Sequence, residues 1–89
     1  MSSLFRKILG DLMSIDTAIL KEIEMLVLFS PETMREGIKV HKSAADENID
    51  AIQRLFAKGL TTQNDGGYLT SLGIDAVEHV HNLLTILKP

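Results

Sequence analysis

The chain has 89 residues, 45% of them hydrophobic, and its nine basic and twelve acidic residues give a net charge of −3 at pH 7. This length allows one domain with a modest core. The charge argues against a free-standing nucleic-acid-binding protein unless basic residues gather locally. The absence of cysteine excludes disulfides and thiolate chemistry. The most apolar run, 25–29, is too short for a signal peptide or a membrane span, and we expect a cytoplasmic protein.

The first twelve residues are expected to form an N-terminal extension with a short amphipathic helix. Five apolar residues are spaced as one face of a helix, with Arg6 and Lys7 off that face; they are Leu4, Phe5, Ile8, Leu9 and Leu12. This helix would pack on the domain or on a partner. Two alternatives are a membrane-surface anchor and a natural start at Met13, with the domain spanning 13–89.

The next stretch predicts a helix from Ser14 or Asp16 to about Phe29, with Asp16 as a plausible N-cap. Its apolar positions are Ile15, Ile19, Ile23, Leu26 and Val27, and its polar face is Lys21, Glu22 and Glu24. Ser30 and Pro31 indicate a break and a second short helix over roughly 31–37. Residues 38–41 alternate as one short strand that could pair beside a hairpin, or they extend the helix.

Asp46 is expected to open a third helix, whose buried stripe is Ile49, Ile52, Leu55 and Phe56. Gly59 suits the left-handed residue that closes a helix. Two short runs, 60–63 and 68–70, flank Asn64-Asp65-Gly66-Gly67, a composition typical of a tight hairpin turn. Thr70 is placed as the N-cap of a final helix over 71–87. Helix, hairpin and helix in this order predict a mainly α fold with a small β-hairpin.

The final helix is apolar over more of its circumference than contact with one small core requires. We therefore expect it to pack on two surfaces, the second belonging to another subunit. The predicted homodimer interface consists of Val77, Val80, Leu84 and Leu87.

Three helices followed by a hairpin resemble the winged helix-turn-helix class. The run Leu55-x-x-Lys58-Gly59-Leu60, followed by Gly67-Tyr68-Leu69-Thr70-x-x-Gly73, is similar to the wing of bacterial regulators of the MarR and PadR type. That resemblance implies a DNA-binding dimer with the third helix in the major groove. A second resemblance is carried by Glu36-Gly37-Ile38-Lys39-Val40-His41, Lys58-Gly59-Leu60, Asp65-Gly66-Gly67-Tyr68-Leu69-Thr70 and Leu83-Leu84-Thr85-Ile86-Leu87. These runs look like a family of small uncharacterised gammaproteobacterial proteins. The resemblance is closer than the first, covers nearly everything from Met13 on, and implies no activity.

The leading hypothesis is double-stranded DNA binding in transcriptional control. The candidate contact residues are Arg35, Lys39, Lys42, Ser43, Asn48, Arg54, Lys58, Gln63 and Asn64. The competing interpretation is a solvated face, because Glu36, Asp46, Glu47 and Asp50 almost cancel these charges. Carboxylates at the start of the third helix also repel phosphates where such a helix normally meets bases. The alternative function is a protein–protein interaction module that does not bind DNA.

Catalysis and metal binding have no support in the sequence. No nucleophile–base set or phosphate-binding glycine loop is present, so we expect a non-enzyme without cofactors. His79 and His81 point some 200° apart on a helix, and Glu78 with His81 supplies two ligands without a third. Polar residues flanking a dimer helix are the simpler interpretation.

Overall fold

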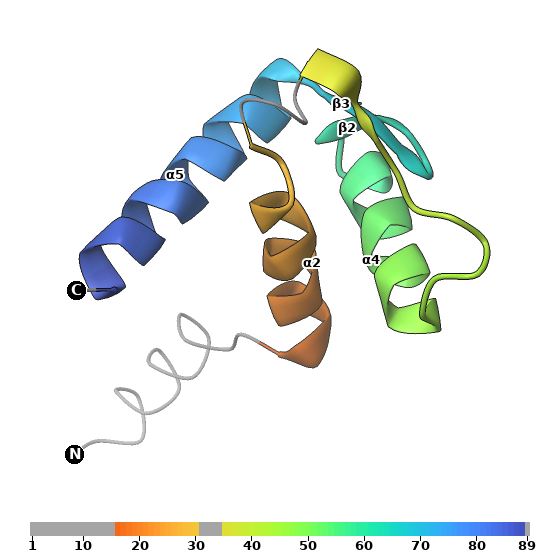
Figure 1. Ribbon diagram of the computed structural model, residues 1–89, viewed down its shortest axis with the longest axis horizontal. Coiled ribbons are helices and arrows are strands. Elements are labelled where there is room, and N and C mark those ends of the chain that lie inside the picture. The colour runs from red at the N-terminus through yellow and green to blue at the C-terminus, as the bar shows by residue number, and fades with distance from the viewer. Residues whose placement is uncertain (1–15, 31–34, 89) are drawn as a thin grey trace, which may run out of the picture.

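A computed structural model describes residues 16–30 and 35–88. The elements in these ranges are α2 (Thr17–Val27), β1 (Ile38–Lys39), α4 (Asp46–Ala57), β2 (Thr61–Gln63), β3 (Gly66–Leu69) and α5 (Ser71–Leu87) (Figure 1). The predicted fold class is confirmed: the described chain is mainly helical with a small antiparallel sheet, consistent with a winged-helix-like fold. The predicted helix in 1–12 and most of the predicted second helix lie outside the described residues.

Helix α2 begins where its cap was predicted. Asp16 has extended backbone angles, and its Oδ1 accepts a hydrogen bond from the Ile19 amide at 2.8 Å, which satisfies one of the free amides of the first turn. The helix ends at Val27, two residues before the predicted end, and α4 and α5 both pack against it.

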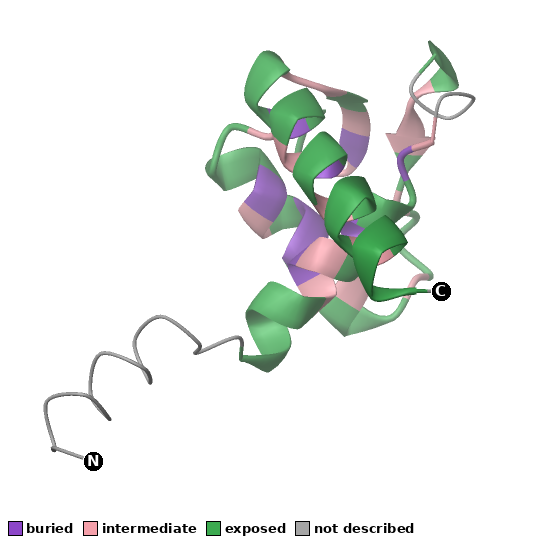
Figure 2. Cartoon of the chain, turned by 90° about the vertical axis from the view of Figure 1, so that its left-hand side faces the viewer, coloured by how far each residue is buried: buried purple, intermediate pink, exposed green. Residues whose placement is uncertain are grey.

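The core lies where α2, α4 and α5 meet, as the purple segments in Figure 2 show. Its buried apolar residues are Met25, Leu26, Phe29, Ala51, Ile52, Leu55 and Val77. Three residues predicted to face this core are instead exposed: Ile19, Val27 and Phe56. Because each helix is covered by neighbours over only part of its circumference, residues at the edge of its apolar stripe stay in solvent.

The sheet joins the hairpin to the strand that precedes α4. The strand order is β1-β3-β2, with both pairs antiparallel, and Ile38 is opposite Gly67. The prediction of a short strand pairing beside the hairpin is therefore confirmed, although β1 has only two residues. Gly66 has a φ of +126°, and a Cβ there would lie 2.4 Å from the Ile38 carbonyl oxygen. This close approach requires glycine.

The hairpin turn is shorter than the predicted four residues. Asn64 and Asp65 form the turn, while Gly66 and Gly67 already belong to β3. Both glycines have positive φ angles. They therefore permit the backbone conformation of β3 rather than that of the turn. The Asp65 carbonyl accepts a hydrogen bond from the Val40 amide at 2.7 Å. This bond fixes the hairpin tip beside the segment that leaves β1.

Helix α5 has the predicted bounds, 71–87, and the predicted cap. Thr70 Oγ1 accepts from the Gly73 amide at 3.1 Å and donates to the Gly59 carbonyl at 2.5 Å. One hydroxyl thus caps α5 and ties its start to the end of α4.

We predict that Thr70→Val lowers the free energy of unfolding by about 1–2 kcal/mol, because the isosteric side chain loses both hydrogen bonds. Urea unfolding followed by circular dichroism measures this change. Thr62→Val is the matched control, since Thr62 Oγ1 is exposed and accepts one bond, from the Tyr68 amide. Equal losses in the two variants would contradict a capping role for Thr70.

Candidate nucleic-acid interface

An open groove separates the hairpin tip from α4. Its volume is about 830 Å³. The lining residues come from the end of β1, the β1–α4 connection, α4 and the hairpin turn. They are Lys39, Val40, His41, Lys42, Ser43, Ile49, Ile52, Gln53, Asn64 and Asp65. Apolar side chains of α4 and Val40 contribute part of the lining, and polar side chains the rest. We refer to this feature as the wing groove.

The chain folds locally in a way that places these residues together. The Ala44 amide donates to the His41 carbonyl at 3.0 Å, so residues 41–44 form a tight turn. Lys42 and Ser43 lie in this turn, and both are exposed. The bond between Val40 and the Asp65 carbonyl holds Asn64 on the opposite side. Segments about 20 residues apart in sequence therefore meet at one groove.

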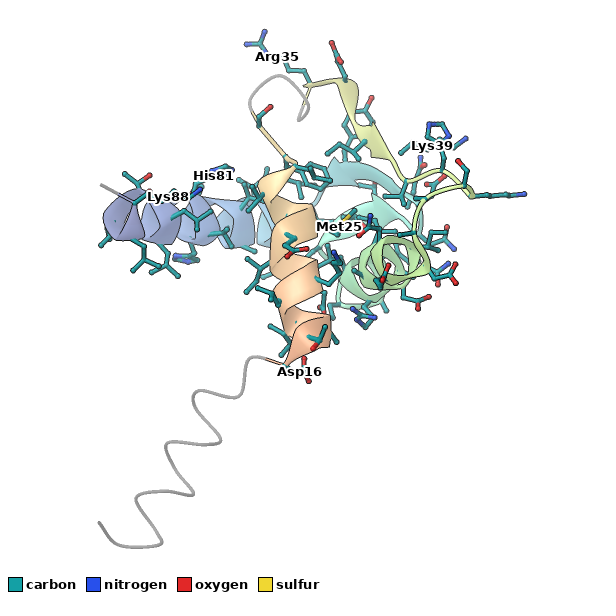
Figure 3. The ribbon with its side chains drawn as sticks, turned by 60° about the horizontal axis from the view of Figure 1, so that its bottom comes forward. Asp16, Met25, Arg35, Lys39, His81 and Lys88 are labelled. Carbon is teal, nitrogen blue, oxygen red and sulfur yellow. The ribbon has the colours of Figure 1, made fainter. Side chains whose placement is uncertain are left out.

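Four of the nine predicted DNA-contact residues line the wing groove: Lys39, Lys42, Ser43 and Asn64. Gln63 is exposed in β2 next to this site, without lining it. Asn48 lines a smaller adjoining pocket of about 370 Å³, which shares Lys39, Val40, His41 and Ser43 with the groove. Arg35 lies apart from Lys39 (Figure 3). His41 and Gln53 also line the groove, although they were not predicted as contacts. The sequence offers only two indications: His41 precedes Lys42, and Gln53 belongs to α4.

Two further predicted contact residues are engaged on the other side of α4. Arg54 Nε lies 3.1 Å from Glu22 Oε2, Arg54 Nη2 donates to the Ala18 carbonyl at 3.1 Å, and Lys58 Nζ pairs with Glu22 Oε1. Glu22 itself is buried, with 6% of its surface exposed. Its predicted place on the polar outer face of α2 is therefore wrong. A buried carboxylate needs cationic partners, and Arg54 and Lys58 supply them.

The exposed start of α4 is acidic. Asp46 and Glu47 occupy its first turn, and the N-cap residue Ala45 forms no side-chain capping bond. Carboxylates here favour the positive end of the helix dipole. Nearby, Lys21 pairs with Glu24 at 2.8 Å, and this hydrogen bond, more than the charge of Glu47, raises the pKa of Lys21. Among the described residues, Lys39 and Lys42 are the exposed basic side chains that line the groove, whereas Lys21, Arg54 and Lys58 pair with carboxylates.

The four predicted dimer residues have different environments. Val77 is only 4% exposed and belongs to the core of its own chain, and Val80 packs against that core. Leu84 is half-buried, whereas Leu87 is 66% exposed. His81 Nε2 donates to the Phe29 carbonyl at 3.1 Å, which links α5 to the end of α2. In the described part of the chain, no group of three or more His, Asp or Glu residues is arranged to hold a metal ion.

A protein-family model described as "Family of unknown function (DUF5669)" matches residues 13–88. No curated protein and no solved structure matches the chain. Over residues 16–30 and 35–88, no helix combines the length and the apolar character needed to cross a membrane.

Proposed function

This chain belongs to the DUF5669 family, and we propose that it is a winged helix-turn-helix protein that binds double-stranded DNA through the wing groove. The observation that carries the proposal is the convergence of Lys39, Lys42, Ser43 and Asn64 from separate segments beside the exposed face of α4. Two lysines that line one groove together with α4 and the hairpin tip suit the phosphate backbone of a duplex.

The groove residues divide by chemistry. Lys39 and Lys42 would neutralise phosphates, and Ser43 and Asn64 would donate hydrogen bonds to the backbone. Gln53 is the exposed α4 residue in the groove, and a glutamine on a recognition helix can pair with both the N6 and N7 groups of adenine. The proposal includes a homodimer, because helix-turn-helix readers commonly bind two half-sites. It includes no catalytic step and no cofactor.

The test is fluorescence anisotropy of the full chain with random duplex DNA at low and at physiological salt. We expect salt-sensitive binding by the unsubstituted protein. Replacing both Lys39 and Lys42 with glutamine should weaken low-salt binding by about tenfold or more and reduce the slope of log K against log salt by about 2.

Lys58→Gln is the control for each single variant, Lys39→Gln or Lys42→Gln, because it removes one charge from a lysine that is paired with Glu22. We expect it to leave DNA affinity within about twofold, since Lys58 does not line the groove. An equal loss for Lys58→Gln and for the groove variants would point to net charge rather than the wing groove. Absence of binding even at low salt would overturn the proposal.

A second candidate function is a protein-interaction module that does not bind DNA. It is favoured by the neutralisation of Arg54 and Lys58 by Glu22 and by the acidic start of α4. Affinity purification of the full chain from nuclease-treated lysate tests it. One partner recovered in stoichiometric amount by a chain that ignores duplex DNA at low salt would select this function over the first.

A further inference from the structure

Most of the exposed large apolar side chains in the described chain lie on two helices, α2 and α5. Of the eleven large apolar residues exposed in the described chain, nine lie on α2, on its C-cap residue Leu28 or on α5; only Phe56 and Tyr68 lie elsewhere. The residues beyond Val80 on α5 are exposed, with Leu84 as the exception, and the end of this helix is mostly green in Figure 2. Scattered apolar residues on a surface are ordinary, but a contiguous group on one element marks an interaction site.

Five residues along one side of α5 follow a heptad spacing. Leu72, Ala76, His79, Leu83 and Ile86 are separated by four, three, four and three residues, which is the alternation of a coiled-coil seam. We refer to these five positions as the outer seam. Leu72 and Leu83 are each 55% exposed and Ile86 is 79% exposed. Apolar side chains are therefore available at both ends of the seam.

Apart from Ala76, which is half-buried and packs against the core, the outer seam is distinct from the part of α5 that contacts the core. Gly73 and Val77 are buried, and Val80 and Leu84 are half-buried. With 3.6 residues per turn, the centre of the outer seam lies roughly 110° around the helix from these four positions. A helix with two apolar stripes packs on two partners, and the described chain supplies only one of them.

We propose that the outer seam is the docking surface for the same seam of α5 in a second copy of this chain. Knobs-into-holes packing requires a partner helix with the same 3.5-residue repeat, and a second copy provides that repeat by symmetry. The seam contains no Asp, Glu, Lys or Arg, and Asp75 is the one charged residue of α5 that borders it. Two seams therefore meet without opposing like charges in their centre.

This surface differs from the one predicted from the sequence. Val77 and Val80 face the core of their own chain, so the partner meets Leu72, Leu83 and Ile86 instead. His79 lies in the middle of the seam and is exposed. A single polar residue at such a position fixes register and lowers affinity. Since α5 is about 25 Å long, the interface is at the small end of specific interfaces and should dissociate in the micromolar range.

Sedimentation velocity of the full chain without DNA, from about 1 to 500 µM, tests the inference. The expected result is a reversible monomer–dimer equilibrium. Leu83→Asp should raise the dimer Kd by about 100-fold or more, because a two-fold interface loses the apolar contact twice and gains two buried carboxylates. His79→Leu should lower the Kd by about tenfold, because it removes the polar position from the seam.

Ile74→Asp is the matched control: Ile74 is an exposed apolar residue of the same helix, about 160° from the outer seam. We expect its Kd to stay within about threefold of the unsubstituted chain, and the melting of each variant by circular dichroism verifies folding. A chain that remains monomeric at the highest concentration would overturn the inference. Equal weakening by Ile74→Asp and Leu83→Asp would also overturn it.

The dimer is measured without nucleic acid, so this result is independent of DNA binding. A dimer with the expected variant behaviour that ignores DNA would support the outer seam and count against the proposed function. A chain that stays monomeric and binds DNA in a salt-sensitive way would overturn the outer seam and support the proposed function.

Discussion

Gly73→Ala is expected to destabilise the protein by about 3 kcal/mol or more, although alanine normally stabilises a helix by about 1 kcal/mol relative to glycine. A Cβ at this position would lie 2.1 Å from the Leu60 carbonyl oxygen and 3.0 Å from Leu69 Cδ2. The obstructing oxygen is part of the backbone and accepts a hydrogen bond from the Thr70 amide at 3.0 Å. It cannot move without disturbing the junction of α4, the hairpin and α5.

Urea unfolding followed by circular dichroism measures the loss, and Gly59→Ala is the matched control. Gly59 has a φ of +84°, but a Cβ there would meet nothing within 4 Å. Its replacement should therefore cost only the backbone strain of a left-handed alanine, about 1–2 kcal/mol. A Gly73→Ala protein as stable as the unsubstituted chain would show that the first turn of α5 does not pack directly on the Leu60 backbone.

The parts of the fold that could be predicted from the sequence are those set by local chemistry. Asp16 and Thr70 act as caps because an acceptor side chain must precede a helix and reach back to its first amides, a requirement confined to four residues. The bounds of α5 and the presence of the hairpin follow from equally local signals. The exposure of Phe56 could not be predicted in this way, because it depends on which side of α4 the neighbouring elements cover.

The candidate site was predictable only in part for the same reason. Lys39, Lys42 and Ser43 are close in sequence, so their proximity required no knowledge of the fold, and Asn64 joins them through the pairing of β1 with the hairpin. Arg54 and Lys58 are also basic and were predicted as contacts for the same reason, yet they pair with Glu22, which is 32 and 36 residues away in the sequence. A basic residue read from sequence carries no information about whether a distant carboxylate has already neutralised it.

The two proposed surfaces are on different elements. The wing groove is formed by the β1–α4 connection, α4 and the hairpin, whereas the outer seam belongs to α5, which extends away from α4 and the hairpin in Figure 1. Two features join these parts: α5 contacts β3, and the Thr70–Gly59 hydrogen bond ties the start of α5 to the end of α4. A second copy on α5 would therefore leave each wing groove open, and the rigid start of α5 would fix the separation of the two grooves.

Glu22→Lys is expected to destabilise the protein by about 3–5 kcal/mol, which is a large part of the free energy of unfolding of a domain of this size. The substitution removes the carboxylate that holds Arg54 and Lys58 and adds a third cation at a position that is 6% exposed. Glu22→Gln, which keeps the size and removes only the charge, should cost about 2 kcal/mol, because Arg54 and Lys58 are partly exposed and can turn toward water.

Thermal and urea unfolding of the double variant Glu22→Lys/Lys58→Glu, which exchanges the two charges, separates the electrostatic contribution to stability from the packing contribution. Adding Lys58→Glu to Glu22→Lys restores one ion pair between α2 and the end of α4, and it gives Arg54 a carboxylate neighbour. We expect the double variant to recover at least about 1 kcal/mol relative to Glu22→Lys alone. If Lys58→Glu instead lowers the stability further, by adding its own loss to that of Glu22→Lys, the contacts of Glu22 with Arg54 and Lys58 do not stabilise the protein through charge. Burial of Glu22 would then reflect packing of its methylene groups against α4.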